Sequence, residues 1–489
     1  MNSYQYDFII IGAGAAGFAA AIKAEQLGVK TLIVSGGNVP LGGTCINVGC
    51  MPSKRLLAAG EMYWNAGHNK FEGVATKSGS LNFQKVITSK DALVSALQKK
   101  TYADVLQGLK YIELKEGDPE PPPRGGGYGA GAKFIDEHTV AVGNERISAD
   151  KFLISAGSST FIPPIDGLDK VPYLTNIEAL SLKKKPVSMV ILGGGPLGLE
   201  FAQMYSRFGV KVTVLEFGPQ IAGREEPELA SFLQKKLEQE GITIYTNART
   251  KSVRQKRNLI EVRAEIGGNE VITAAQKILV ATGVKANTHS LNLEAAGVKI
   301  SEKGGIITNE MMQTNIPHIY SAGDVTDQAG VEISPKLETI AGREGFVAAS
   351  NALENKQIKI DFRAVPHAIF TDPSLASVGL IDAEAAKVSI ACSCKTLSLE
   401  FVPKAHILEA TDGLIKMVID AKTEEVLGVH MAGARADEII SMASFMVKYR
   451  MKLEDIIENT FIFPTMSEAV KWVAQSFKKD VAKLSCCTE

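Results

Sequence analysis

Two glycine-rich turns constrain the fold of this chain more than any other feature. The first lies in YDFIIIGAGAAGFAAAIKAEQLGVKTLIVS, where a predicted strand over residues 8–11 precedes G-x-G-x-x-G, an alanine-rich helix and a strand over residues 30–35. The segment VSMVILGGGPLGLEFAQMYSRFGVKVTVLEFG repeats this order. Because such glycines let a pyrophosphate bind at the N-terminus of the following helix, the two units predict two Rossmann-like dinucleotide-binding domains. Their glycines are Gly12, Gly14 and Gly17 in the first turn and Gly193, Gly195 and Gly198 in the second.

The residue that ends the second strand of each unit bears on which dinucleotide is bound. In the second unit this residue is Glu216, whose carboxylate accepts hydrogen bonds from a ribose 2′-hydroxyl and repels a 2′-phosphate. We therefore expect NADH to be favoured over NADPH. Arg224, eight residues further on, would weaken this preference. The first unit has Ser35 at the equivalent position, which is a shorter and uncharged acceptor.

Charge and hydropathy argue against nucleic acid or a membrane as partner. Lys and Arg number 53 against 54 Asp and Glu, so the 489 residues carry a formal net charge of -1 and no broad positive field. The apolar run DFIIIGAGAAGFAAAIKA lacks a basic leader and is interrupted by glycines, unlike a signal peptide or a membrane span. We expect a cytoplasmic protein that acts on small molecules.

The remaining pattern predicts an α/β chain that is divided into segments. Turns at Gly157 and Gly283 each follow a short strand and mark crossings between domains, and TNIPHIYSAGDVTD places another strand before Asp324. From about residue 361, strands followed by helices indicate a separate α+β domain. The proline- and glycine-rich segment 116–131 is interpreted as an exposed loop without a chemical role.

The segment GGTCINVGCMPSK, residues 42–54, brings Cys45 and Cys50 close together. A metal site, a structural disulfide and a redox dithiol all fit this spacing. Six cysteines in the whole chain are too few for a disulfide scaffold, and a reducing compartment disfavours a structural disulfide. The positive end of a helix starting here would lower the thiol pKa and favour the thiolate, which attacks disulfides and binds soft metals. Redox or metal chemistry is therefore favoured.

With two dinucleotide folds and this cysteine segment, the chain resembles the class I flavoprotein disulfide reductases, or pyridine nucleotide-disulfide oxidoreductases, over nearly its whole length. The resemblance implies that the first Rossmann-like domain binds FAD and the second binds NADH or NADPH. It also implies a homodimer joined through the C-terminal α+β domain. The implied domains are residues 1–160 and 286–360 for FAD, 161–285 for NAD(P), and 361–489 for dimerisation, with a C-terminal Cys-Cys tail.

The resemblance implies roles for individual residues as well. Cys50 would lie next to the flavin, and Cys45 would be the outer thiol that exchanges with the acceptor. Lys54 would approach the flavin and pair with Glu200, while Asp324 would bind ribityl hydroxyls. The implied cofactor-binding residues are Gly12, Gly14, Gly17, Ser35, Gly43, Thr44, Lys54, Gly157, Gly193, Gly195, Gly198, Glu216, Gly283 and Asp324.

The segment FIFPTMSEAV bears on the acceptor. Family members that reduce glutathione disulfide or lipoamide have a His-Pro dipeptide here, whose histidine is the acid-base catalyst. This chain has Phe463 before Pro464, and a phenylalanine cannot transfer a proton. An organic disulfide is therefore disfavoured as the substrate.

The C-terminal tail KKDVAKLSCCTE resembles that of the mercuric reductases, in which the tail of one subunit reaches the active site of the other. Hg(II), a soft ion that two thiolates suit, would arrive as a thiol complex. It would pass from Cys486 and Cys487 to Cys45 and Cys50 and be reduced there to Hg(0). These reductases usually carry tyrosines at the positions of Phe463 and, often, Pro196, which this chain lacks.

Other readings stay open. The same fold could reduce lipoamide, a low-molecular-weight disulfide or, through the tail cysteines, a protein disulfide. A non-enzymatic flavin or thiol metal-binding protein is a further alternative. Cys392 and Cys394 have metal-like spacing, but they lie on an apparent strand whose alternation turns both to one face, so a buried structural role is favoured over a ligand role.

Overall fold

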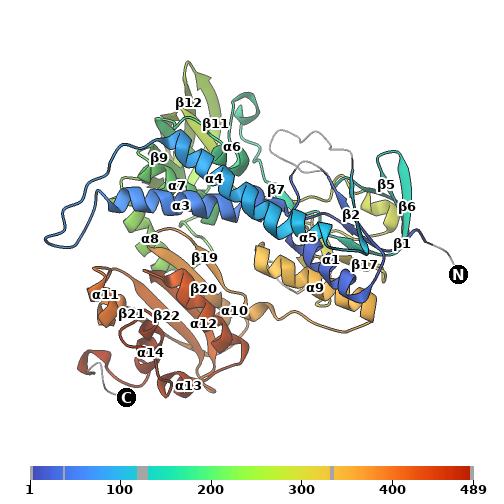
Figure 1. Ribbon diagram of the computed structural model, residues 1–489. Coiled ribbons are helices and arrows are strands. Elements are labelled where there is room, and N and C mark those ends of the chain that lie inside the picture. Colours follow the sequence, from blue (N-terminus) through green and yellow to red (C-terminus); the bar gives the residue numbers. More distant parts are fainter. Residues whose placement is uncertain (1–3, 37–38, 118–129, 331–334, 485–489) are drawn as a thin grey trace.

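The computed structural model describes residues 4–36, 39–117, 130–330 and 335–484 (Figure 1). Most of the proline- and glycine-rich segment 116–131 lies outside the described residues, as do Cys486 and Cys487 of the tail. Within these ranges, we find no helix that combines the length and the apolar character needed to cross a membrane.

The first glycine turn belongs to a largely parallel sheet with strand order β3-β2-β1-β6, to which β17 adds by pairing with β6. The strands are β1 (Tyr6–Ile11), β2 (Thr31–Ser35), β3 (Ile112–Glu116), β6 (Glu145–Ile154) and β17 (Ile319–Ser321). The antiparallel strands β5 (Thr139–Val142) and β4 (Lys133–Asp136) extend it beyond β6. Helices α1 (Ala15–Leu27) and α9 (Glu338–Glu354) pack side by side on this sheet (Figure 1). This first domain therefore combines strands that precede the second glycine turn in the sequence with β17 and α9, which follow it.

The second glycine turn belongs to a smaller parallel sheet with strand order β10-β9-β8-β14. Its strands are β8 (Ser188–Leu192), β9 (Lys211–Leu215), β10 (Thr243–Tyr245) and β14 (Lys277–Val280), and its helices include α7 (Pro196–Arg207) and α8 (Pro227–Gln239). An antiparallel sheet of β11 (Ala248–Lys256), β12 (Leu259–Ile266) and β13 (Asn269–Ala275) accompanies it. The two segments that connect the domains, after Gly157 and after Gly283, lie side by side, because β7 (Ser158–Thr160) pairs with β15 (Val284–Ala286).

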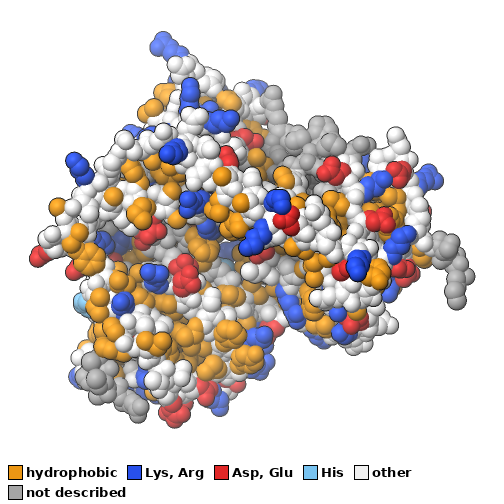
Figure 2. All heavy atoms as spheres, in the orientation of Figure 1, with side chains coloured by type: hydrophobic (Ala, Val, Ile, Leu, Met, Phe, Trp, Pro, Cys, Tyr) orange, Lys and Arg blue, Asp and Glu red, His pale blue; other side chains and the backbone are white. Residues whose placement is uncertain are grey.

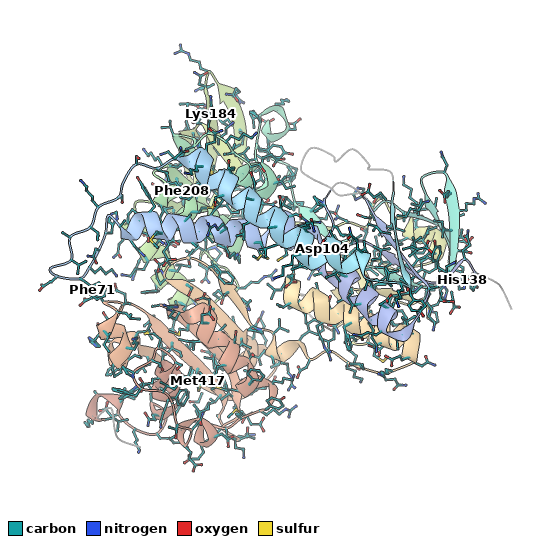
Figure 3. The ribbon with its side chains drawn as sticks, viewed as in Figure 1. Phe71, Asp104, His138, Lys184, Phe208 and Met417 are labelled. Carbon is teal, nitrogen blue, oxygen red and sulfur yellow. The ribbon has the colours of Figure 1, made fainter. Side chains whose placement is uncertain are left out.

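The C-terminal part forms an antiparallel sheet with strand order β19-β20-β23-β22-β21. The strands are β19 (His367–Ile369), β20 (Ser374–Gly379), β21 (Cys392–Ser398), β22 (Leu414–Asp420) and β23 (Val426–Gly433), and helices α12 (Ala436–Lys448) and α14 (Glu468–Gln475) pack against them. Met417 on β22 is fully buried in this core (Figure 3). The α/β class with a C-terminal α+β domain, predicted from the sequence, is confirmed.

Two long helices, α3 (Cys50–Asn65) and α4 (Phe83–Gln98), run across the centre of the molecule (Figure 1). Leu56 of α3 and Phe83 of α4 share one apolar core with Tyr205 and Phe208, which belong to the second dinucleotide fold (Figure 3). This packing holds the cysteine segment at the start of α3 against α7.

Candidate active site

The first glycine turn leads into α1 through tight backbone packing. Gly12 has a φ of 116°, and a Cβ atom there would lie 2.2 Å from the carbonyl oxygen of Ser155. Only glycine tolerates both conditions. Gly14 precedes α1 as an N-cap without a side-chain hydrogen bond, and the first turn holds no acidic residue. The open N–H groups and the helix dipole fit the pyrophosphate of a dinucleotide.

The second turn repeats this geometry and adds a carboxylate. A Cβ atom at Gly193 would lie 2.3 Å from the carbonyl oxygen of Ala281, and α7 begins after Gly195 with no side-chain cap. Glu216, directly after β9, accepts the N–H of Gly194 on Oε2 and the N–H of Gly218 on Oε1, both at 2.5 Å. The carboxylate that the sequence associates with nucleotide preference therefore lies against the glycine turn.

Cys45 and Cys50 meet where two helices follow each other. Cys45 lies in α2 (Gly43–Val48), and Cys50 is the first residue of α3 after the N-cap Gly49. Both are free thiols. A hydrogen bond from the Cys45 thiol lowers the pKa of Cys50, and Lys54 adds to this effect while burial opposes it. The same hydrogen bond, together with burial, raises the pKa of Cys45, so the pair contains one sulfur that ionises readily and one that keeps its proton.

An ion pair connects this dithiol to the second dinucleotide fold. Lys54 Nζ donates to Oε2 of Glu200 on α7 at 2.7 Å, and the N–H of Phe370 donates to Oε1 of the same carboxylate at 3.1 Å. The Lys54 ammonium also lies 4.5 Å from the centroid of the Phe370 ring. Phe370 directly follows β19, so helices α3 and α7 and the C-terminal sheet all contribute to this contact. Phe370 was not predicted from the sequence, because its segment AIFTDP indicates only a short strand.

The residues assigned to FAD lie around the start of α1. A Cβ atom at Gly43 would lie 2.8 Å from Cα of Gly14, and one at Gly323 would lie 3.4 Å from Cβ of Ala16. Asp324 follows Gly323, and its Oδ2 accepts the hydroxyl of Ser158 at 2.7 Å, next to the crossing at Gly157. The cysteine segment, the Asp324 turn and the crossing therefore lie close to the first glycine turn.

Tyr102 is a second residue near the cysteines that was not predicted from the sequence. It lies in a short π-helix (Lys99–Ala103), and its ring packs edge-on against Phe18 with centroids 4.8 Å apart. A Cβ atom at Gly42, in the cysteine segment, would lie 2.8 Å from this ring. Burial raises the pKa of Tyr102 to about 12, and the nearby Glu338 carboxylate adds to the rise. No motif marks this tyrosine, since only the folded chain brings it to the cysteines.

Phe463 lies on the surface of the C-terminal domain, where its residue is 54% exposed. Hydrophobic side chains gather on the face of this domain that Figure 2 shows. The domain's large exposed apolar residues include Phe445, Tyr449, Ile462 and Phe463. Of the remaining predicted site residues, Ser35 ends β2, Thr44 precedes Cys45 in α2, and Gly283 precedes β15.

Two dinucleotide folds with a thiol pair and a lysine-glutamate ion pair between them define an oxidoreductase that couples nucleotides to thiol chemistry. Comparison with known proteins agrees. The family described as pyridine nucleotide-disulphide oxidoreductase matches residues 6–353, and its dimerisation domain matches residues 365–474. The chain therefore belongs to the pyridine nucleotide-disulphide oxidoreductase family, as the sequence predicted, and uses FAD and NAD(P)H as its cofactors.

Individual relatives match nearly the whole chain. The mercuric reductase of Staphylococcus aureus is 36% identical over 483 residues, which cover 99% of this chain and 84% of that protein. The mercuric reductase of Streptomyces lividans is 36% identical over 489 residues, covering 99% and 98%. Among solved structures, the Cu(II) complex of the HOCl-induced flavoprotein disulfide reductase RclA from Escherichia coli has a TM-score of 0.82 at 27% identity, covering 98% of this chain and 100% of that one.

Proposed function

We propose that this chain reduces Hg(II) to Hg(0) with electrons from NADH or NADPH. The observation that carries the proposal is the pair of free thiols, Cys45 in α2 and Cys50 at the start of α3. Two thiolates are a sufficient ligand set for a soft ion. The relatives that match the chain along its length and bear the name mercuric reductase support this choice of substrate.

Phe463 favours a metal ion over an organic disulfide. Reduction of an organic disulfide releases a thiolate that an acid must protonate, and a phenyl ring cannot do so. Reduction of a bound Hg(II) ion needs two electrons and no proton. A chain with phenylalanine at this position can still reduce Hg(II), but it lacks the acid catalyst for reduction of an organic disulfide.

The residues of the site have distinct proposed roles. The N–H groups in the first turns of α1 and α7 hold the pyrophosphates of FAD and of the nicotinamide cofactor. FAD, when bound, passes the two electrons of NAD(P)H to the acceptor. Cys50, whose pKa is lowered, supplies the first thiolate to the arriving ion. Cys45 gives up its proton as it binds, because the metal–sulfur bonds replace the hydrogen bond to Cys50 that otherwise raises its pKa.

Delivery of the ion is proposed to come from a second copy of the chain. The exposed apolar residues of the C-terminal domain, Phe445 and Tyr449 among them, support a homodimer through the dimerisation domain. Cys486 and Cys487 of one subunit would then hand Hg(II) to the dithiol of the other by thiolate exchange. In this proposal both subunits contribute to each active site, and the enzyme acts in the cytoplasm.

The test is an acceptor screen with both nicotinamides. We expect Hg(II)-dependent oxidation of NADH in the presence of excess small thiol, with release of Hg(0) vapour. The double substitution Cys486→Ala, Cys487→Ala should reduce this rate strongly at high thiol, because the ion then has no carrier, while leaving reduction of the flavin by NADH intact. Cys392→Ala with Cys394→Ala is the matched control and should keep the rate. Fast turnover of lipoamide or glutathione disulfide without any response to Hg(II) would overturn the proposal.

The likeness to RclA favours a second candidate, a disulfide reductase of the same family with another acceptor. That structure contains Cu(II), so Cu(II) belongs in the screen beside the organic disulfides. The substitution Phe463→His separates the two candidates. It should raise organic disulfide turnover if the missing acid is what limits that reaction, and it should not raise the Hg(II)-dependent rate.

A further inference from the structure

A second pair of cysteines lies outside the candidate active site. Cys392 and Cys394 lie on β21, the edge strand of the C-terminal sheet, and positions two apart on a strand share one face. Asp382, the first residue of α10 (Asp382–Lys387), lies against that face, and the Cys392 thiol donates to its Oδ1 at 3.3 Å. The two sulfur atoms and a carboxylate oxygen all lie within 4.8 Å of one another.

We propose that Cys392, Cys394 and Asp382 form a second binding site for a thiophilic divalent cation of the Hg(II) and Cd(II) class. Thiolates are the ligands that such soft ions select, and a carboxylate can complete the set. A zinc–sulfur bond is about 2.3 Å, and the larger Cd(II) and Hg(II) ions reach at least as far, so one such ion can bridge ligand atoms that lie within 4.8 Å of one another. The site shares no residue with the active-site dithiol.

The charges around the cluster favour a cation. Lys416 lies 4.0 Å from Oδ2 of Asp382, but its ammonium is closer to Glu226 at 2.9 Å and to Glu228 at 3.3 Å. One ammonium among three carboxylates leaves a net negative charge before either thiol ionises. That negative charge attracts a cation to the cluster.

The geometry of Cys392 and Cys394 suits a bridging metal ion better than a disulfide bond. Residues two apart on an extended strand have Cα atoms about 6.6 Å apart, near the upper limit for a disulfide, and their side chains point in parallel. A metal ion bridges the sulfur atoms without bending β21. The binding reaction is a simple exchange in which the cation forms two metal–sulfur bonds and two thiol protons pass to solvent. It requires no oxidant or reductant.

The proposal can be tested in the full-length flavin-loaded protein. The substitutions Cys45→Ser, Cys50→Ser, Cys486→Ser and Cys487→Ser leave Cys392 and Cys394 as the remaining pair of the six cysteines. Titration of this variant with Cd(II) should give a thiolate-to-metal absorbance band that saturates at one ion per chain, and a higher Tm. Adding Cys392→Ser and Cys394→Ser should abolish both signals. Bound flavin with the same spectrum in both variants shows that each is folded.

Two further variants assign the third ligand. Asp382→Asn should weaken Cd(II) binding by about tenfold or more, whereas Ser393→Ala, on the opposite face of the same strand, should leave it unchanged. The proposal fails if the four-serine variant binds no Cd(II), or if binding survives the loss of Cys392 and Cys394. Because that variant lacks the active-site and tail cysteines, the outcome is independent of whether the enzyme reduces Hg(II).

Discussion

The 2.7 Å contact between Lys54 Nζ and Glu200 Oε2 joins the helix that starts at Cys50 to the helix that follows the second glycine turn. The side chains are 32% and 7% exposed, so solvent screens the pair only in part. Removing either partner of a partly buried ion pair leaves the other charge unpaired and still partly shielded from water, which destabilises the fold. The ion pair therefore holds the dithiol helix in place as well as keeping a positive charge near the sulfur atoms.

The substitution Glu200→Gln tests this contact. Glutamine keeps the acceptor oxygen but removes the charge, so we expect the free energy of unfolding to fall by about 1–3 kcal/mol and flavin reduction by NADH to slow. Urea unfolding and stopped-flow absorbance measure the two effects. The control is Glu265→Gln, which breaks the Lys251–Glu265 pair of equal length but 45% and 50% exposure and should cost clearly less, because solvent screens the exposed charges. An equal loss of unfolding free energy in the two variants would contradict the argument that burial strengthens the Lys54–Glu200 pair.

The reactivity of Cys50 should depend on pH in a defined direction. Only a thiolate is alkylated, and a lowered pKa keeps the thiolate present at lower pH. In the reduced enzyme, the rate of Cys50 alkylation by iodoacetamide should therefore rise through a midpoint below 9.0, the ordinary thiol value. Cys45→Ala should move the midpoint upward more than Lys54→Met does, because the hydrogen bond is the larger cause. Peptide mapping follows the reaction, and a midpoint that neither change moves would refute this account.

Glu216 should make the enzyme prefer NADH. Its carboxylate is held against the glycine turn by the N–H groups of Gly194 and Gly218, where it repels a 2′-phosphate. Steady-state kinetics with both cofactors should give the higher kcat/KM for NADH. Glu216→Gln keeps the acceptor and removes the charge, and should shift the ratio toward NADPH by about tenfold, or about 1.4 kcal/mol. A wild-type enzyme that favours NADPH tenfold would contradict this role of Glu216.

Gly345 should be essential for the packing of α9 on α1. A Cβ atom at Gly345 would lie 1.9 Å from the carbonyl oxygen of Ala16, so Gly345→Ala must push the two helices apart. We expect a loss of about 1–3 kcal/mol in stability and a lower flavin content after purification. Gly342→Ala on the same helix is the control, because its Cβ atom would meet nothing within 4 Å and alanine favours a helix by about 1 kcal/mol. Urea unfolding and the ratio of flavin to protein absorbance distinguish the two.

The sequence was most informative where the signal is local. Gly12 and Gly193 could be placed after strands because turn chemistry and alternating apolar runs depend on neighbouring residues. The fold class and the family followed from these turns and from the spacing of Cys45 and Cys50. The domain limits and the roles of the site residues stay predictions, as does the function of the tail.

The sequence by itself determined the glycine turns, the cysteine segment and the family to which the chain belongs. Only the tertiary structure decided which distant residues meet: β17 beside β6, Phe370 on the Lys54–Glu200 pair, Tyr102 against the cysteine segment, and Asp382 with Cys392. Turns and helix starts arise from interactions between neighbours in the chain, whereas these contacts arise from apolar packing between elements, which no local pattern records.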